Sequence, residues 1–211
     1  MTEEQISRLR KRFDQPLPGW EAQQQMATRV HRNARFQPRP DARRAAVLML
    51  LYPHQGETHL PLIVRPVYEG VHSGQIALPG GKVQEYDHSI VHTALRETAE
   101  EIGVSVPEDQ VLGVLSELYI PPSNMLVTPV VAYSEKKPQY QPDPLEVAEV
   151  LDFPLAAFAR PRHQQVLPIR VANGQTLQAP SYVIEERVIW GATAMMMSEL
   201  TALVQQAVRL R

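Results

Sequence analysis

A short acidic segment is the part of the chain whose residue types point most directly to chemistry. Glu97, Glu100 and Glu101 fall within five residues, in a stretch whose apolar residues recur at helical spacing. On a helix these carboxylates converge on one face, and each like-charged pair costs about 0.2–0.5 kcal/mol. A divalent cation reverses that repulsion. Because hard oxygen ligands suit Mg²⁺ and also Mn²⁺, the segment predicts a Mg²⁺ or Mn²⁺ site.

The surrounding residues distinguish this prediction from the simpler one of a solvated acidic face. Pro79-Gly80-Gly81 predicts a tight turn at which the backbone can approach a ligand closely. Arg96, directly before Glu97, has a forked guanidinium that can orient a carboxylate. An acidic run alone is usually a solvated face. It is the combination of turn, arginine and glutamates that favours a functional site.

A helix must position these side chains. Asp87 is expected near its start, where a carboxylate can cap free N–H groups. Gly103 is expected at its end, with positive φ. The buried stripe of this helix should consist of Val91, Ala94, Leu95, Thr98 and Ile102.

The rest of the chain alternates between helical patterns and short apolar runs. Helices are expected at residues 3–13, 20–32 and 193–210, with a helical turn at 154–160. Extended segments are expected at residues 45–52, 60–67, 111–120, 125–133, 163–171, 180–186 and 187–190. This interleaving predicts a mixed α/β (α+β) fold. We expect an N-terminal helical extension, residues 1–42, followed by one main domain, residues 43–211.

The acidic segment and its glycine turn resemble the Nudix box. This motif usually reads G, five residues, E, seven residues, R-E-U-x-E-E-x-G-U, where U is aliphatic. Asp87 replaces the first glutamate, eight residues rather than seven separate it from Arg96, and Thr98 stands at an aliphatic position. The matching residues are Gly81, Arg96, Glu97, Glu100, Glu101, Gly103 and Val104.

A neighbouring stretch resembles the coenzyme A pyrophosphatase branch of the Nudix superfamily. That branch has the same expansion with aspartate, and an upstream signature that ends in H-x-G-Q-x-A-F-P-G-G. Residues His72–Gly81 read HSGQIALPGG, with Leu78 in place of phenylalanine, and Arg65 resembles the arginine that opens the signature. The usual Leu-Arg pair ahead of the histidine is absent, because Glu69 and Gly70 stand there.

The resemblance implies a Nudix-like mixed sheet sandwiched between helices. It also implies a hydrolase that cleaves a nucleoside diphosphate derivative with Mg²⁺ or Mn²⁺ and water. For coenzyme A or an acyl-CoA the products would be 3′,5′-ADP and (acyl-)4′-phosphopantetheine. Glu97 and Glu101 would be the first metal ligands, and Glu100 either a third ligand or the base that aligns water. Arg96 would fix a glutamate rather than touch substrate.

Four positions are expected to contact the substrate. Backbone N–H groups at Gly80 and Gly81 could hold a phosphate oxygen. His72 could donate to a phosphate or pack as a structural hydrogen-bond donor. With Gly70 in place of arginine, we expect Arg65 and an arginine of the Arg35–Arg44 segment to share the 3′-phosphate.

Several other features have two interpretations each. Glu146 and Glu149 could complete the metal shell from a loop or be ordinary surface charge. His88 and His92 have a zinc-like spacing, but Ser89 stands where a zincin has glutamate, which favours exposed histidines.

Two further segments are ambiguous in the same way. The basic run Arg29–Arg44 could be a solvated face or bind the 3′-phosphate. Trp190 and the methionines at 195–197 are more typical of a buried closing helix than of an acyl-chain site.

Composition limits the class of protein. The chain has 211 residues, a net charge of −2 and no cysteine, which excludes disulfides and argues against a nucleic-acid partner. No segment approaches the roughly 18 apolar residues of a membrane span, and the charged N-terminus lacks an apolar signal sequence. We therefore expect no membrane partner and a cytoplasmic location.

The expected partner is a small-molecule, CoA-type nucleotide, and a homodimer is left open. Two alternatives to coenzyme A hydrolysis remain. One is a Nudix hydrolase of another derivative such as ADP-ribose. The other is a non-catalytic nucleotide-sensing module, which the intact glutamates disfavour.

Overall fold

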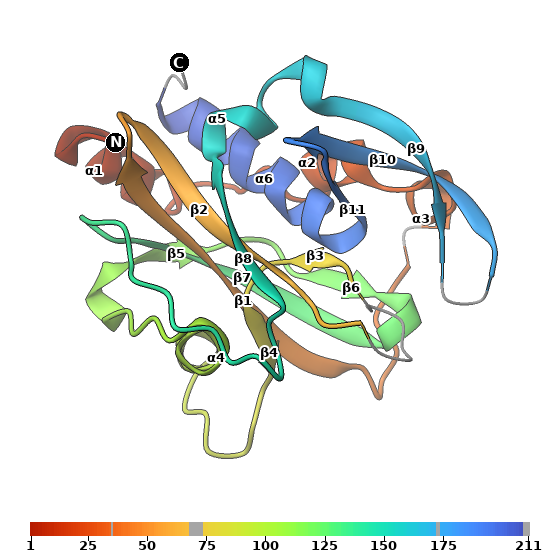
Figure 1. Ribbon diagram of the computed structural model, residues 1–211, viewed down its shortest axis with the longest axis horizontal. Helices are drawn as coiled ribbons and strands as arrows, with labels where there is room; N and C mark the ends of the chain where they lie inside the picture. The colour runs from red at the N-terminus through yellow and green to blue at the C-terminus, as the bar shows by residue number, and fades with distance from the viewer. Residues whose placement is uncertain (35, 68–73, 172–173, 209–211) are drawn as a thin grey trace.

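The computed structural model describes residues 1–34, 36–67, 74–171 and 174–208. A mixed sheet lies at its centre, with helices on both sides (Figure 1), which confirms the predicted α/β class. The helices are α1 (Glu3–Arg12), α2 (Gly19–Gln23), α3 (Arg29–Ala34), α4 (Ile90–Ile102), α5 (Leu155–Phe158) and α6 (Gly191–Ala207), with 3-10 turns η1 (Gln24–Met26), η2 (Glu108–Gln110), η3 (Pro121–Ser123) and η4 (Pro161–His163). The strands are β1 (Arg43–His54), β2 (Glu57–Val64), β3 (Ile76–Ala77), β4 (Gly80–Lys82), β5 (Val111–Val114), β6 (Leu118–Ile120), β7 (Met125–Tyr133), β8 (Glu149–Pro154), β9 (Gln164–Arg170), β10 (Thr176–Ile184) and β11 (Arg187–Trp190).

Strand β1 is the centre of the main sheet. It pairs in parallel with β7, from Arg43 opposite Met125 to Leu51 opposite Tyr133, and antiparallel with β2 and β4. The described main sheet runs β3-β2-β1-β7-β5, with β4 on β1, β6 on β7 and β8 on β2. Strands β9, β10 and β11 form a second, antiparallel sheet.

Both faces of β1 are buried, which explains its unbroken apolar run. Leu48 and Leu50 face a core that includes residues of α4. Met49 and Leu51 face the larger core that includes residues of α6. Helix α4 therefore covers one face of the sheet, and α6 with α1 and α2 covers the other (Figure 1).

Helix α1 forms as the sequence predicts. Thr2 and Gln5 make a capping box at its start. Leu9 is fully buried, and Phe13 packs so closely on Gly113 that a Cβ there would lie 2.8 Å from the Phe13 Cβ. No helix in the described ranges is long and apolar enough to cross a bilayer.

The prediction of one continuous helix at residues 20–32 is wrong. The chain forms α2, η1 and α3 instead, with a break at Ala27, which is extended (φ −78°, ψ 143°) and fully buried. Burial of Ala27 and Met26 in the same core as α6 outweighs the local helical pattern. Although these N-terminal residues share that core, the division of the chain at residue 42 stays a prediction.

Candidate active site

Helix α4 carries the acidic residues, and its two ends are well defined. Ser89 is the N-cap, and its hydroxyl accepts a hydrogen bond from the His92 N–H at 2.9 Å. Gly103 ends the helix with φ +70°, as predicted. The prediction that Asp87 caps the helix is wrong. Asp87 lies ahead of the cap and accepts hydrogen bonds from the Gln84 N–H and from side chains of α4.

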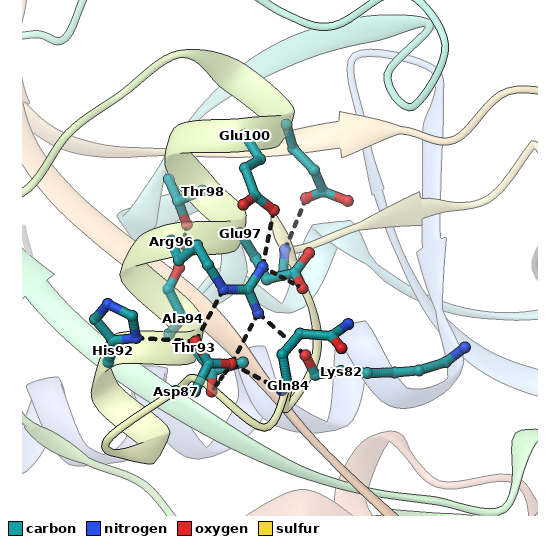
Figure 2. A network of polar contacts seen from close by, with 12 residues as sticks. Lys82, Gln84, Asp87, His92, Thr93, Ala94, Arg96, Glu97, Thr98 and Glu100 are labelled. Carbon is teal, nitrogen blue, oxygen red and sulfur yellow. Dashed lines mark hydrogen bonds and ion pairs between the residues drawn. The ribbon is translucent and has the colours of Figure 1, made fainter.

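The strongest contact of Asp87 is a forked one with Arg96. The guanidinium donates from Nε to Oδ1 and from Nη2 to Oδ2, both at 2.9 Å (Figure 2). Thr93 donates to Asp87 Oδ2, and His92 Nδ1 lies 2.9 Å from Oδ1. The Asp87 side chain is fully buried, and Arg96 in first place holds the pKa of this carboxyl well below its usual range. Asp87 thus holds one edge of the Arg96 guanidinium in place.

The other edge of Arg96 faces the glutamates. Its Nη1 lies 2.9 Å from Glu97 Oε1 and donates to Glu100 Oε2 at 2.8 Å, while Nη2 also donates to the Lys82 carbonyl at 3.2 Å. Arg96 therefore touches two glutamates, as expected, but its fork engages Asp87. Figure 2 shows the guanidinium between Asp87 on one side and Glu97 and Glu100 on the other.

Gly81 makes room for Glu97. A Cβ built on Gly81 would lie 2.7 Å from Glu97 Oε1 and closer to Oε2, so only glycine permits the carboxylate to lie against this strand. Desolvation raises the pKa of Glu97, in part offset by the Arg96 contacts. Glycine at this box position thus serves the placement of a carboxylate.

Gly80 contacts another box residue, Glu101. Its N–H, which we expected to hold a phosphate oxygen, donates to Glu101 Oε2 at 2.7 Å, so this donor is engaged by the protein. Glu101 is only 3% exposed. Burial raises its pKa to about 7, against the lowering effects of the Gly80 N–H and the Arg65 charge. The charge of Glu97 also raises the pKa of Glu101 by repulsion.

The loop between β7 and β8 docks on the end of α4. The Gln141 N–H donates to the Ile102 carbonyl at 2.9 Å, and the Asp143 N–H donates to the Glu101 carbonyl at 3.0 Å. A Cβ on Gly103 would lie 2.7 Å from the Gln141 Cβ. Gly103 therefore provides both the left-handed turn and the space for the loop.

The structure places Glu146 and Glu149, which the sequence left open as metal-shell residues or ordinary surface charge, in different surroundings. The charge of Glu146 raises the pKa of both Glu97 and Glu101, which places it near them. Glu149 lies on β8 and pairs with Arg187 at 2.9 Å instead. Glu146 is thus a further carboxylate near Glu97 and Glu101.

A cavity of about 460 Å³ opens beside Gly80 and Gly81. Arg65 lines it, and the buried Arg65 Nε has no hydrogen-bond partner among the described residues. His72, the other predicted substrate contact, lies outside the described residues. Met195 and Met196 line the cavity and are nearly fully buried, which confirms the closing helix as a core element.

The described part of the basic run bonds largely to the protein itself. Arg32 donates to the Gln24 carbonyl at 3.2 Å, and Arg43 donates to the Ser123 carbonyl at 3.1 Å. Arg44 lies 3.8 Å from Glu117. Arg35 is outside the described residues, and a role for the run in binding a phosphate stays a prediction.

Comparison with known proteins agrees with this geometry. The family model described as NUDIX domain matches residues 42–169, more than half of the chain. This chain belongs to the Nudix family. The human "Mitochondrial coenzyme A diphosphatase NUDT8" is 34% identical over 163 residues, 76% of this chain and 68% of that protein.

A bacterial relative and a crystal structure extend the comparison. The "Uncharacterized Nudix hydrolase NudL" of Pectobacterium atrosepticum is 36% identical over 166 residues, 78% of this chain and 84% of that protein. The crystal structure of the Nudix hydrolase RenU from M. Smegmatis matches with a TM-score of 0.51 at 19% identity, over 81% of this chain and 90% of that one. At that identity the match shows a shared fold.

The donor set of this Nudix site suits a divalent metal ion. Glu97 and Glu101 are hard oxygen ligands whose anionic forms are disfavoured by burial and by repulsion from neighbouring carboxylates, and a cation offsets both effects. As the side chains lie, no group of three His, Cys, Asp or Glu among the described residues is arranged to hold a metal ion. Glu97 bonds to Arg96 and Glu101 to the Gly80 N–H.

A zinc ion at His88 and His92 would lack a third His, Cys, Asp or Glu ligand arranged to hold it among the described residues. The His88 and His92 rings lie with centroids 4.1 Å apart, and His92 contacts Asp87. His92 therefore helps to surround the Asp87 carboxylate. Sequence reasoning missed this contact, because Asp87 was placed at the helix cap rather than in front of the helix.

Proposed function

We propose that this protein hydrolyses the pyrophosphate of coenzyme A or acyl-CoA, yielding 3′,5′-ADP and (acyl-)4′-phosphopantetheine. The observation that carries the proposal is the 34% identity to the human coenzyme A diphosphatase over 76% of the chain. The HSGQIALPGG stretch ahead of the box supports the same substrate. The coarser statement, that the chain is a Nudix hydrolase, follows from the family match.

The proposed reaction transfers one phosphoryl group to water. A water oxygen forms a bond to one phosphorus, the bridging P–O bond breaks, and the bridging oxygen leaves with the other phosphate. A Mg²⁺ or Mn²⁺ held by Glu97 and Glu101 would neutralise the negative charge of the diphosphate and of the leaving oxygen. The remaining contributions come from the protein's own side chains.

We assign the metal to Glu97 and Glu101, with Glu100 as a third ligand or as the base that orients water. Glu146, from the docked loop, is added to this group because its charge acts on both Glu97 and Glu101. Arg96 does not touch substrate in this proposal. It holds Glu97 and Glu100 in place, which reduces the reorganisation needed during reaction.

We assign the substrate contacts to residues on the side of β4 that faces the cavity. Arg65 is assigned to the diphosphate or to the 3′-phosphate, since its buried Nε is left without a protein partner among the described residues. Gly81 and His72 stay predicted phosphate contacts. Gly80 contributes instead through its bond to Glu101.

ADP-ribose or another nucleoside diphosphate derivative is the second candidate substrate. The observation in its favour is Gly70, which stands where the coenzyme A branch usually has arginine. A non-catalytic sensing module is disfavoured, because Glu97, Glu100 and Glu101 are all present. The cytoplasmic location and the homodimer stay predictions.

A substrate panel tests the proposal. Purified protein is incubated with Mg²⁺ or Mn²⁺ and coenzyme A, dephospho-coenzyme A, ADP-ribose or a diadenosine polyphosphate, and the products are separated by chromatography. We expect 3′,5′-ADP from coenzyme A and the highest kcat/KM for that substrate, since specificity comes from contacts beyond the shared diphosphate. A clear preference for ADP-ribose would transfer the assignment to the second candidate. Glu97→Gln, purified identically, controls for contaminating hydrolases.

A further inference from the structure

The cavity beside the Nudix box is lined in part by segments outside the family match, residues 42–169. Thr28 and His31 come from the chain ahead of residue 42, and Leu177, Trp190 and Met196 come from the chain after residue 169. Contacts that distinguish one substrate from another lie beyond the diphosphate that all of them share. The flanking segments are therefore placed to contribute to the selection of the substrate, together with the cavity residues inside the match.

The cavity has little charge. Of its described lining residues, Arg65 is the one side chain with a formal charge at neutral pH. His31 also lines it, and burial lowers the pKa of this imidazole, which favours the neutral form. Arg65 lies near enough to Glu101 of the box for its charge to lower the pKa of that carboxyl. The cavity thus suits an uncharged group that is attached to an anion near Arg65.

We propose that this cavity binds the pantetheine arm of the substrate, with any acyl group on its sulfur, and that the ADP arm lies outside. This inference rests on the proposed function, because it takes coenzyme A as the substrate. Gly81 connects the two regions, because it lines the cavity and contacts Glu97. A diphosphate bound at the glutamates therefore directs one of its two arms into the cavity.

Charge decides between the two arms. The ADP arm carries a 3′-phosphate with a charge of about −1.5 to −2. Inside the cavity this group would be desolvated, and Arg65, the one charged side chain among the described lining residues, would in this proposal be engaged by the diphosphate. The pantetheine arm is uncharged and needs only a few polar partners for its amides, which Thr28 and Ser123 offer among the lining residues. Ile120, Met125 and Leu177 add an apolar wall that suits an acyl chain.

The two reaction products separate the arms experimentally. S-Acyl-4′-phosphopantetheine carries one arm and 3′,5′-ADP the other, so each is titrated alone into the protein in EDTA. Tryptophan fluorescence reports binding without catalysis, because Trp190 lines the cavity. For the wild-type protein we expect each added methylene of the acyl chain to strengthen binding about three- to fourfold until the cavity is filled.

A pair of alanines on α6 gives a matched test. Ala192 lines the cavity, whereas Ala202 is half-buried on the same helix and does not line it. Ala192→Phe should weaken hexanoyl-phosphopantetheine binding tenfold or more and leave 3′,5′-ADP within twofold. Ala202→Phe should leave both ligands unchanged.

Two results would overturn the arm assignment. One is a wild-type affinity that does not depend on acyl length. The other is an Ala192→Phe protein that loses 3′,5′-ADP and keeps the acyl ligand, which would place the nucleotide in the cavity. Should Ala192→Phe fail to fold, the chain-length series on the wild-type protein still decides. Cleavage of coenzyme A is measured in a separate assay. If the protein cleaves coenzyme A but its binding of S-acyl-4′-phosphopantetheine does not depend on acyl length, the proposed function stands and this inference fails.

Discussion

Gly81→Ala is the smallest change that displaces the Glu97 carboxylate without altering its charge. The added Cβ would lie 2.7 Å from Glu97 Oε1 and closer to Oε2, whereas ordinary van der Waals contact begins at 3.4 Å. The carboxylate must therefore move by about 1 Å, and a misplacement of that size can lower a rate by about a hundredfold. We expect kcat/KM for coenzyme A to fall by about that factor.

Stability should respond much less, because the clashing atoms are the end of a flexible side chain. Turning Glu97 away loses one contact with Arg96, worth about 0–1 kcal/mol, or a shift of at most about 2–4 °C in Tm for a chain of this size. Gly80→Ala is the matched contrast. Its φ of +149° and a Cβ only 2.5 Å from Val47 Cα would strain backbone atoms, at about 1–3 kcal/mol for each effect.

The assay compares thermal unfolding by circular dichroism with coenzyme A hydrolysis for the two variants. The reasoning predicts that Gly81→Ala keeps its Tm and loses activity, while Gly80→Ala loses both. A Gly81→Ala protein with activity within threefold of the wild type would show that the position of Glu97 is not needed. Equal destabilisation of the two variants would show that both glycines serve the fold alone.

Three further changes test other parts of the site. Gly103→Ala should lower the free energy of unfolding in urea by about 1–3 kcal/mol more than Gly56→Ala does. Both glycines have positive φ, but a Cβ on Gly56 meets nothing within 4 Å. Equal losses of unfolding free energy would contradict the docking of the loop on Gly103. Glu146→Gln should lower kcat/KM tenfold or more. Glu149→Gln, which removes a carboxylate paired with Arg187, should leave it unchanged. Equal activity of the two variants would show that Glu146 is not part of the site. Asp87→Asn should cost about 3 kcal/mol at pH 7. The arginine partner lowers the pKa of the buried Asp87 carboxyl in the folded state, so the ion pair stabilises the fold above about pH 3.9, the pKa of an aspartate in the unfolded chain. The difference in unfolding free energy between Asp87→Asn and the wild type should therefore narrow below pH 4. A constant difference down to pH 3 would refute the pairing.

The sequence predicted the elements that depend on local pattern. Helix α4 ends at Gly103 as expected, because positive φ at a helix end is a local requirement. The predicted extended segments coincide with β1, β2, β7, β9, β10 and β11. The single segment expected at residues 111–120 is wrong, because the chain forms two strands there, β5 and β6, and β3, β4 and β8 were not predicted. The start of α4 was predicted incorrectly, because the Asp87 carboxylate bonds to the Arg96 side chain instead of capping the helix.

Features built from distant segments could not be predicted. Glu146 and Glu149 are three residues apart, and only the docking of their loop and strand shows that one faces the box and the other Arg187. The break at Ala27 reflects burial in a core shared with α6. The cavity walls come from segments more than a hundred residues apart, such as His31 and Trp190, and no spacing in the sequence connects them.

Glu101→Gln compared with the wild-type protein is the most direct test of the proposed catalytic site. Glutamine can still accept the Gly80 N–H, so the fold and its Tm should be preserved, while one anionic oxygen ligand is lost. With Mg²⁺ and coenzyme A, we predict that kcat/KM falls by about a hundredfold or more. Unchanged hydrolysis of coenzyme A by the folded variant would contradict the assignment of this glutamate and of the metal site built on it.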